Sequence, residues 1–169
     1  VFNPSSETLV EYTVPSRNPN WADCEGIEYC GVAQVFDFAV DGKKIWFTEW
    51  VENNIGVVDT SIPLPFSIDI DTKEITLKKG ETAMVTFQVT KTSSQHIMQS
   101  INVNYSTAST FSDITIKPEL NDFSLSDAPI TISVEVTASE YALSGTHNVL
   151  LGGYTDDIAI SQFIIVTIV

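Results

Sequence analysis

Two cysteines and two histidines are the side chains of this 169-residue chain with the widest chemical repertoire. Cys24 and Cys30 lie in the acidic segment Ala-Asp-Cys-Glu-Gly-Ile-Glu-Tyr-Cys-Gly. A zinc site would need further Cys or His ligands at suitable spacing, and a redox pair more often reads Cys-x-x-Cys. We therefore predict a disulfide that closes this loop, rather than two unrelated buried thiols. A disulfide indicates an oxidising environment, and hence an extracellular or cell-surface protein.

The two histidines, His96 and His147, are not accompanied by a motif of nucleophilic catalysis. A serine nucleophile needs a base within hydrogen-bond reach, and the sequence contains no Gly-x-Ser-x-Gly motif and no glycine-rich phosphate loop. We expect His96 in a loop and His147 at the edge of a sheet. No catalytic residue is predicted, and the protein is not expected to be an enzyme.

Carboxylates occur in pairs at expected turns, as at Asp69 and Asp71 and at Asp156 and Asp157. Acidic pairs on hairpin turns are usually solvated surface groups, and none of these segments matches the EF-hand pattern. Hard cations nevertheless prefer clustered oxygen ligands. We predict no metal and no other cofactor, and keep calcium at these four aspartates as the alternative.

Carbohydrate chemistry is indicated at two kinds of position. Trp21, Tyr29, Trp46 and Trp50 could form an aromatic platform for a sugar, although packing is the commoner use of such side chains. Asn104 begins the triplet Asn-Tyr-Ser, which is a sequon for N-glycosylation. A carbohydrate-binding module is therefore one alternative function.

The charge of the chain excludes two classes of partner. Eight Lys and Arg residues face 22 Asp and Glu residues, for a formal net charge of −14 at pH 7. Contacts to nucleic-acid phosphates and to anionic lipid both require clustered basic side chains. No apolar run approaches the roughly 18 residues that span a bilayer. The sequence starts at Val1 without an initiator Met, which suggests a removed leader or a piece of a longer chain.

Abundant Val, Ile and Thr favour strands over helices, so an all-β fold is predicted. Two prolines in Ser-Ile-Pro-Leu-Pro, residues 61–65, mark a boundary between a first domain, 1–60, and a second, 61–169. The first domain should hold four strands, near residues 9–14, 33–40, 44–50 and 55–59. The second should hold eight, near residues 66–70, 74–77, 82–90, 97–105, 111–117, 129–137, 147–154 and 158–168.

The second domain has the strand number and turn spacing of an immunoglobulin-like β-sandwich. Apolar residues alternate with polar ones in its strands, which predicts the side chains that face the core. The residues assigned to that core are Val85, Phe87, Val89, Ile130, Ile132, Val134, Val136, Ile160, Phe163, Ile165 and Ile168.

The segment Gly-Lys-Lys-Ile-Trp-Phe-Thr-Glu, residues 42–49, followed by Asn-Ile-Gly-Val-Val-Asp, residues 54–59, resembles a blade of virginiamycin B lyase-like β-propellers. The opening Val-Phe-Asn-Pro-Ser-Ser resembles the stretch after the Ile-Gly of such a blade, so residues 1–3 correspond to residues 57–59 as an internal repeat. Asn54 or Gly56 can adopt a positive φ at a turn. We assign structural roles to the motif residues Trp46, Phe47, Thr48, Glu49, Asn54 and Gly56.

The resemblance covers about one blade, whereas a propeller closes several four-stranded blades into a ring. The catalytic histidines of the lyase family lie in blades that have no counterpart here, so lyase activity is not implied. Strand 9–14 could add to the edge of strand 55–59. Alternatively, the chain is the C-terminal part of a larger propeller enzyme, or pairs its strand edges with other subunits.

The second domain also resembles a known class of module. Its segments Leu-Lys-Lys-Gly-Glu-Thr, residues 77–82, and Leu-Ser-Gly-Thr-His, residues 143–147, are similar to marks of accessory immunoglobulin-like domains in secreted prokaryotic proteins. Together these features predict a non-catalytic secreted or surface-displayed structural protein. It would bind protein partners, or further copies of itself, through strand edges and sheet faces. The alternatives are a fragment of a lyase-like enzyme and a carbohydrate-binding module.

Overall fold

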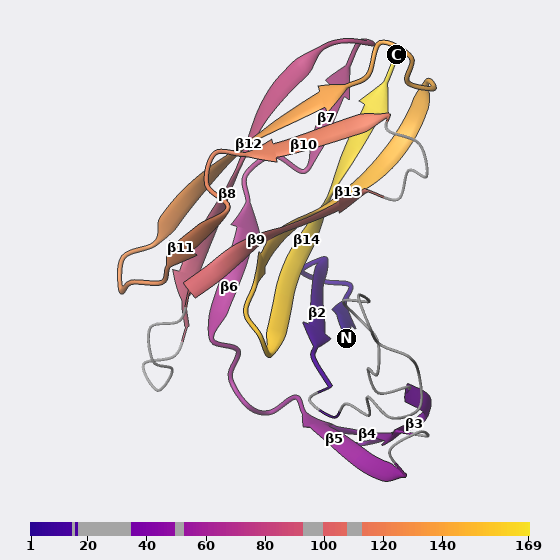
Figure 1. Cartoon of the computed structure of the whole chain (residues 1–169), viewed down its shortest axis with the longest axis vertical. Coiled ribbons are helices and arrows are strands. Elements are labelled where there is room, and N and C mark those ends of the chain that lie inside the picture. Colours follow the sequence, from indigo (N-terminus) through magenta and orange to yellow (C-terminus); the bar gives the residue numbers. More distant parts are fainter. Residues whose placement is uncertain (15, 17–34, 50–52, 93–99, 108–112) are drawn as a thin grey trace, which may run out of the picture. The chain divides into compact units, whose positions relative to one another are not determined.

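The structure is a computed structural model, and it describes residues 1–14, 16, 35–49, 53–92, 100–107 and 113–169. All regular elements in these ranges are β-strands, which confirms the predicted all-β class. They form three sheets whose strand pairs are antiparallel, apart from one parallel pair, β7 with β14 (Figure 1). Nowhere in the described ranges does a helix occur that could cross a membrane.

The chain divides into two compact units. The larger unit contains Val1–Glu11 together with Leu64–Val169, and the smaller unit contains Tyr12–Pro63. The expected division at residues 60 and 61 differs from this arrangement mainly at the N-terminus. The first eleven residues belong to the larger unit because their strand pairs with its sheet and not with strand 55–59.

The larger unit is built from a four-stranded and a seven-stranded sheet. The four-stranded sheet has the spatial order β10 (Ile114–Pro118), β12 (Ile130–Ala138), β8 (Thr82–Lys91) and β6 (Phe66–Ile70). The seven-stranded sheet has the order β1 (Phe2–Asn3), β2 (Thr8–Tyr12), β14 (Ile158–Ile168), β13 (Gly145–Tyr154), β9 (Ser100–Thr107) and β11 (Asp122–Ser124), with β7 (Glu74–Leu77) also paired to β14. Strand β11 was expected to be loop.

The core of the larger unit follows the predicted alternation in most strands. Val85, Phe87 and Val89 of β8 are fully buried, and their partners Val134 and Ile132 on β12 are buried beside them. Apolar side chains from β6, β9, β13 and β14 complete this core. Ile130, at the start of β12, is only half-buried.

The predicted core positions of β14 were half wrong. Ile160 and Ile168 are buried as expected, but Phe163 is half-buried and Ile165 is exposed. Successive side chains of a regular strand point to opposite faces, so odd and even positions of β14 cannot share one face. The even positions face the core, and they include one polar residue, Gln162, which is 6% exposed.

One edge of β14 is shared between two strands from distant parts of the sequence. Strand β13 pairs with Ala159–Ile168 along the other edge, and β7 pairs with Ile165–Ile168 along this one. Because β2 is also hydrogen-bonded to β14, it must lie along the remaining stretch, residues 158–164. Figure 1 shows β2 beside this part of β14.

The smaller unit contains a three-stranded antiparallel sheet of β3 (Val35–Asp41), β4 (Lys44–Glu49) and β5 (Asn54–Asp59). The strands agree with the prediction within the described residues. Gly42 has a φ of 60° in the tight turn between β3 and β4, a conformation that glycine adopts without steric cost. The β3–β4 pairing is irregular between Val35 and Phe38.

Gly152 on β13 permits a contact across the seven-stranded sheet. It lies between its register partners Asn104 and Ser161, and Asn104 Nδ2 donates to Ser161 Oγ at 3.0 Å. A Cβ at Gly152 would lie 2.1 Å from the carbonyl oxygen of Ile160 and 2.6 Å from Ser161 Oγ. The Ile160 carbonyl oxygen is part of the paired backbone of β14, so it cannot move aside as a side chain could.

We therefore expect Gly152→Ala to lower the free energy of unfolding of the larger unit by roughly 1–3 kcal/mol, the usual cost of overpacking. Urea denaturation followed by circular dichroism measures the change. Thr146→Ala, at an exposed position of the same strand, should change stability by less than about 0.5 kcal/mol. Equal stabilities of the two variants would show that the close approach at Gly152 does not matter.

Candidate interaction site

The strands of the smaller unit hold the motif residues Trp46, Phe47, Thr48 and Glu49 on β4, and alternate residues point to opposite faces. Phe47 pairs with Gly56 on β5, and its ring covers the glycine. A Cβ at Gly56 would lie 2.2 Å from Cζ of Phe47. A side chain at this position would therefore have to displace the Phe47 ring.

Thr48 holds the irregular part of β3. Its Oγ1 accepts a hydrogen bond from the amide of Asp37 at 3.2 Å and donates to the Asp37 carbonyl oxygen at 3.5 Å. The carboxylate of Asp37 in turn accepts from the amide of Phe38 at 2.8 Å. These contacts lie where the β3–β4 register shifts, so Thr48 shapes the strand rather than facing a ligand.

Glu49 and the turn after it depart from expectation in one respect. Glu49 is 4% exposed, and its Oε2 has no hydrogen-bond partner in the described part of the chain. The positive φ expected at Asn54 or Gly56 occurs instead at Asn53, with a φ of 53°. Asn54 and Gly56 lie inside β5, where an extended backbone is needed, and so the turn falls one residue earlier.

The ends of the two repeat segments make the same local contact. Asp59 Oδ1 accepts from the amide of Ser61 at 2.9 Å, and Asn3 Oδ1 accepts from the amide of Ser5 at 3.0 Å. The Ser61 hydroxyl also donates to Asp59 Oδ1, at 2.5 Å. These are Asx turns, which fix the direction of the chain as it leaves a strand.

The Asp59 pKa is lowered below its ordinary value. The hydrogen bond from the Ser61 hydroxyl is the largest cause, followed by that from the Ser61 amide. Desolvation opposes this lowering, and Lys44 and Lys43 add still smaller attractions to the carboxylate. The folded turn therefore stabilises the charged form of Asp59.

Both faces of the three-stranded sheet expose large apolar side chains. Phe38 and Val40 lie on the face of Phe47 and are 68% and 65% exposed. We call this the Phe38 face. On the opposite side, Trp46, Val57 and Ile55 form the Trp46 face, and Ile55 is 74% exposed. Exposed apolar side chains gathered on one small sheet mark an interaction surface more often than scattered ones do.

Several predicted site residues lie outside the described residues. These are Cys24, Cys30, Trp21, Tyr29, Trp50 and His96. Two of the six aromatic and histidine candidates lie in described strands: Trp46 belongs to the Trp46 face, and His147 lies in β13, where its Nε2 is 3.3 Å from the Leu143 carbonyl oxygen.

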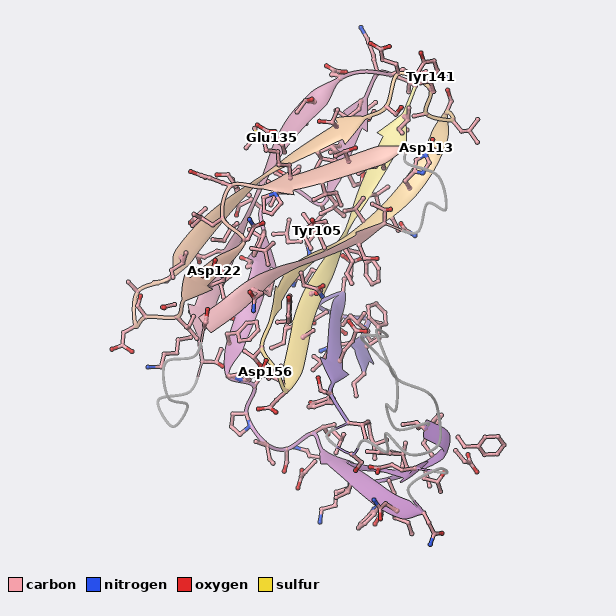
Figure 2. The ribbon with its side chains drawn as sticks, in the orientation of Figure 1. Tyr105, Asp113, Asp122, Glu135, Tyr141 and Asp156 are labelled. Carbon is pink, nitrogen blue, oxygen red and sulfur yellow. The ribbon has the colours of Figure 1, made fainter. Side chains whose placement is uncertain are left out.

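The acidic candidates and the sequon lie on the larger unit. Asp69 is an exposed residue of β6, and Asp71 Oδ2 accepts from Thr86 Oγ1 at 2.9 Å. Asp156 and Asp157 are exposed in the β13–β14 turn, where Figure 2 labels Asp156. Over the described ranges, no three His, Cys, Asp or Glu side chains gather closely enough to hold a metal ion. Asn104 is half-buried. A glycan would be attached at its Nδ2, and this atom donates a hydrogen bond to Ser161 Oγ.

Gln162 is the polar residue that the sequence reasoning missed. Its Oε1 accepts from the amide of Ile70 at 3.3 Å and from Lys73 Nζ at 2.7 Å. Its Nε2 is 3.2 Å from the carbonyl oxygen of Ser6 and 3.3 Å from Thr8 Oγ1. The signal was an amide at a core position of a mostly apolar strand, where a buried polar group needs partners.

A shallow pocket of about 330 Å³ lies next to this network. It is lined by Phe2, Glu7, Lys73, Glu74, Asn148, Phe163 and Ile165. The rings of Phe2 and Phe163 meet edge to face with centroids 6.2 Å apart. The pocket is thus formed where the β1–β2 hairpin meets β7, β13 and β14.

No protein-family model matches the chain, and no curated protein sequence matches it. Among solved structures, it is similar to domains 4 and 5 of the S-layer protein SbsC, with a TM-score of 0.45, 15% identity and 75% of this chain covered. It is also similar to the S-layer protein rSbsC(31-844), with a TM-score of 0.41, 17% identity and the same coverage. The match covers 65% of the first chain and 16% of the second. At TM-scores below 0.5, these similarities do not bear on function.

Gly56→Ala should weaken the pairing of β4 with β5 by roughly 1–3 kcal/mol, because the new methyl group displaces the Phe47 ring. The same substitution in a Phe47→Ala chain should cost less, with a coupling energy of roughly 0.5–3 kcal/mol. Hydrogen exchange of the β5 amides measures both. Additive effects in the double variant would contradict the packing role of the ring.

The Asp59 turn should be pH-dependent. Its pKa is lower in the folded than in the unfolded chain, so its contribution to stability is complete above the unfolded value of about 4 and is lost as the pH falls through the folded value. Ser61→Ala should move the Asp59 pKa back toward its ordinary value in an NMR titration of the carboxyl carbon. Thr60→Val is the control. The Thr60 hydroxyl donates to the Lys43 carbonyl oxygen and not to Asp59, so its loss should leave the Asp59 pKa unchanged.

Proposed function

We propose that this protein is a non-catalytic structural protein, located outside the cell or at its surface, that assembles with further copies of itself through strand edges and sheet faces. The exposure of large apolar side chains on both faces of the β3–β4–β5 sheet is the observation that supports this most. A thin sheet of this kind gains stability when another surface covers it.

The Phe38 face and the Trp46 face are large enough in apolar content to drive association. Full burial of one such side chain is worth about 1.5–3 kcal/mol, whereas association costs on the order of 4–15 kcal/mol of lost freedom. Several of these side chains must therefore be covered together. Among the side chains of this sheet that are more than two fifths exposed are Phe38, Val40, Trp46, Ile55 and Val57.

Strand edges add a directional component to the proposed assembly. Within the described residues, β5 pairs only with β4, so one edge of β5 has no strand partner there. In the larger unit, β6 and β10 end the four-stranded sheet in the same way. Such edges carry backbone donors and acceptors that a strand from another chain can pair.

Charge opposes the assembly of identical copies of this protein. The net charge of −14 gives mutual repulsion that acts over about 10 Å at moderate ionic strength. Assembly through apolar faces should therefore strengthen as salt is raised, because screening weakens the repulsion and leaves the apolar contact intact. Assembly through surface ion pairs would weaken under the same change.

The extracellular location rests on the predicted bond between Cys24 and Cys30. Intact-mass measurement of the native protein before and after reduction and alkylation tests it. A closed bond gives a native chain that alkylates only after reduction, whereas two thiols that alkylate at once would remove the support for this location.

Single lysine substitutions test the two faces separately. Phe38→Lys and Ile55→Lys each place a charge on one face, and we expect the one that lies in the contact to weaken association at least about tenfold in sedimentation velocity. Met84→Lys is the matched control, since Met84 is 56% exposed on β8 of the larger unit. A wild-type chain that sediments as an 18.6 kDa monomer at every concentration and salt would contradict self-assembly.

A further inference from the structure

The β1–β2 hairpin is joined to its sandwich only through another unit. Residues Val1–Glu11 belong to the larger unit, and the chain then runs through the whole smaller unit, Tyr12–Pro63, before it returns at Leu64. No short connection therefore ties β2 to the particular β14 beside which it lies. The next sandwich strand along the chain is β6, in the other sheet.

The place that β2 fills is an edge left by the other strands of the sandwich. Strand β7 pairs with β14 only from Ile165 to Ile168. Without β2, the backbone of β14 from residue 158 to residue 164 would have no strand on this side. The β1–β2 hairpin is thus complementary to an edge that every copy of the chain carries.

The hairpin is held on this edge by few side chains. Val10 is the buried apolar residue of the hairpin, at 9% exposed, whereas Phe2 is 50% exposed although its ring touches Phe163. The buried amide of Gln162 adds bonds to Ser6 and Thr8. Segments with few buried apolar contacts open at a small fraction of the global free energy of unfolding.

We propose that the β1–β2 hairpin is an exchangeable element, so that β2 of one chain adds to residues 158–164 of β14 in a second copy. This deepens the proposed self-assembly and rests on it. The exchanged contact repeats those seen within one chain, including the bonds to Gln162 and the Phe2–Phe163 contact. Its equilibrium is therefore set by chain concentration against the effective concentration of the hairpin in its own chain.

The exchange gives the assembly a direction. Each chain donates one hairpin and accepts another at a different surface, which is a head-to-tail contact. Contacts of this type close into rings or continue as open filaments. The exchange uses no residue of the Phe38 face or the Trp46 face.

A cross-link that locks the hairpin to its own sandwich tests the exchange. The variant carries Phe2→Cys and Phe163→Cys, at the positions of the touching rings, and Cys24→Ser and Cys30→Ser so that no other thiol reacts. A short bis-maleimide applied to dilute monomer joins the two positions within one chain. The locked and untreated forms of this variant are then concentrated and compared by sedimentation velocity.

We expect the locked form to sediment as smaller species than the untreated form at the same concentration, because its hairpin cannot exchange whereas its apolar faces are unchanged. Mixing chains that carry only Phe2→Cys with chains that carry only Phe163→Cys should give cross-linked heterodimers. If the locked form assembles as well as the untreated form, exchange is wrong and self-assembly stands. If the wild-type chain does not assemble at all, the proposed function fails and the exchange with it.

A second variant needs no change at the cysteines. Val10→Asp places a charge on the buried residue of the hairpin, so the hairpin should dock on neither its own nor another β14, and assembly should fall to the level of the locked form. Glu11→Gln, at the exposed neighbouring position, should assemble as the wild type does. Wild-type assembly by Val10→Asp, with circular dichroism showing a folded sandwich, would overturn the exchange.

Discussion

The larger unit depends on hydrogen-bond partners for one edge of β14, which the other strands of the sandwich leave partly unpaired. Strand β13 covers the other edge throughout, but β7 is short and pairs only with the last part of this one. Since β14 is the longest strand, its remaining N–H and C=O groups need a partner from elsewhere in the chain. The N-terminal hairpin supplies it, and the amide of Gln162 joins that hairpin to Ile70 of β6 and to Lys73 between β6 and β7.

The sheet of the smaller unit also leaves groups uncovered, and no described strand of this chain covers them. Its three strands pair with one another, and the ring of Phe47 packs on Gly56, yet both faces retain exposed apolar side chains. A buried carboxylate oxygen of Glu49 also lacks a partner among the described residues. The apolar side chains that remain exposed on this sheet favour its coverage by another surface.

Local patterns predicted most of the strands because alternation and turn residues act over a few positions. The alternation in β8 gave the buried side chains Val85, Phe87 and Val89, and Asp-Gly marked the β3–β4 turn. The strand partner of residues 8–12 could not be predicted in this way. Edge pairing is a choice between distant strands of similar composition, and the deciding fact, the shortness of β7 beside β14, is a property of the assembled fold.

The candidate site shows the same division. Gly56 and Thr48 were predicted as structural from their motif, and their contacts with Phe47 and Asp37 explain why those residue types occur there. Gln162 was not singled out, and Phe163 and Ile165 were placed on the wrong face of β14. An apolar run such as Ile-Ala-Ile-Ser-Gln-Phe-Ile-Ile-Val fits either register, and only its pairing with β13 decides between them.

We propose that other copies of this protein cover its apolar faces and its strand edges that lack a partner. Hydrogen exchange read by mass spectrometry at low and high protein concentration tests this most directly, because it reports each strand separately. Self-assembly should slow exchange in Val35–Asp41 and Asn54–Asp59 at high concentration and leave the core strand Thr82–Lys91 unchanged. Identical exchange of the β3 and β5 amides at every concentration would contradict it.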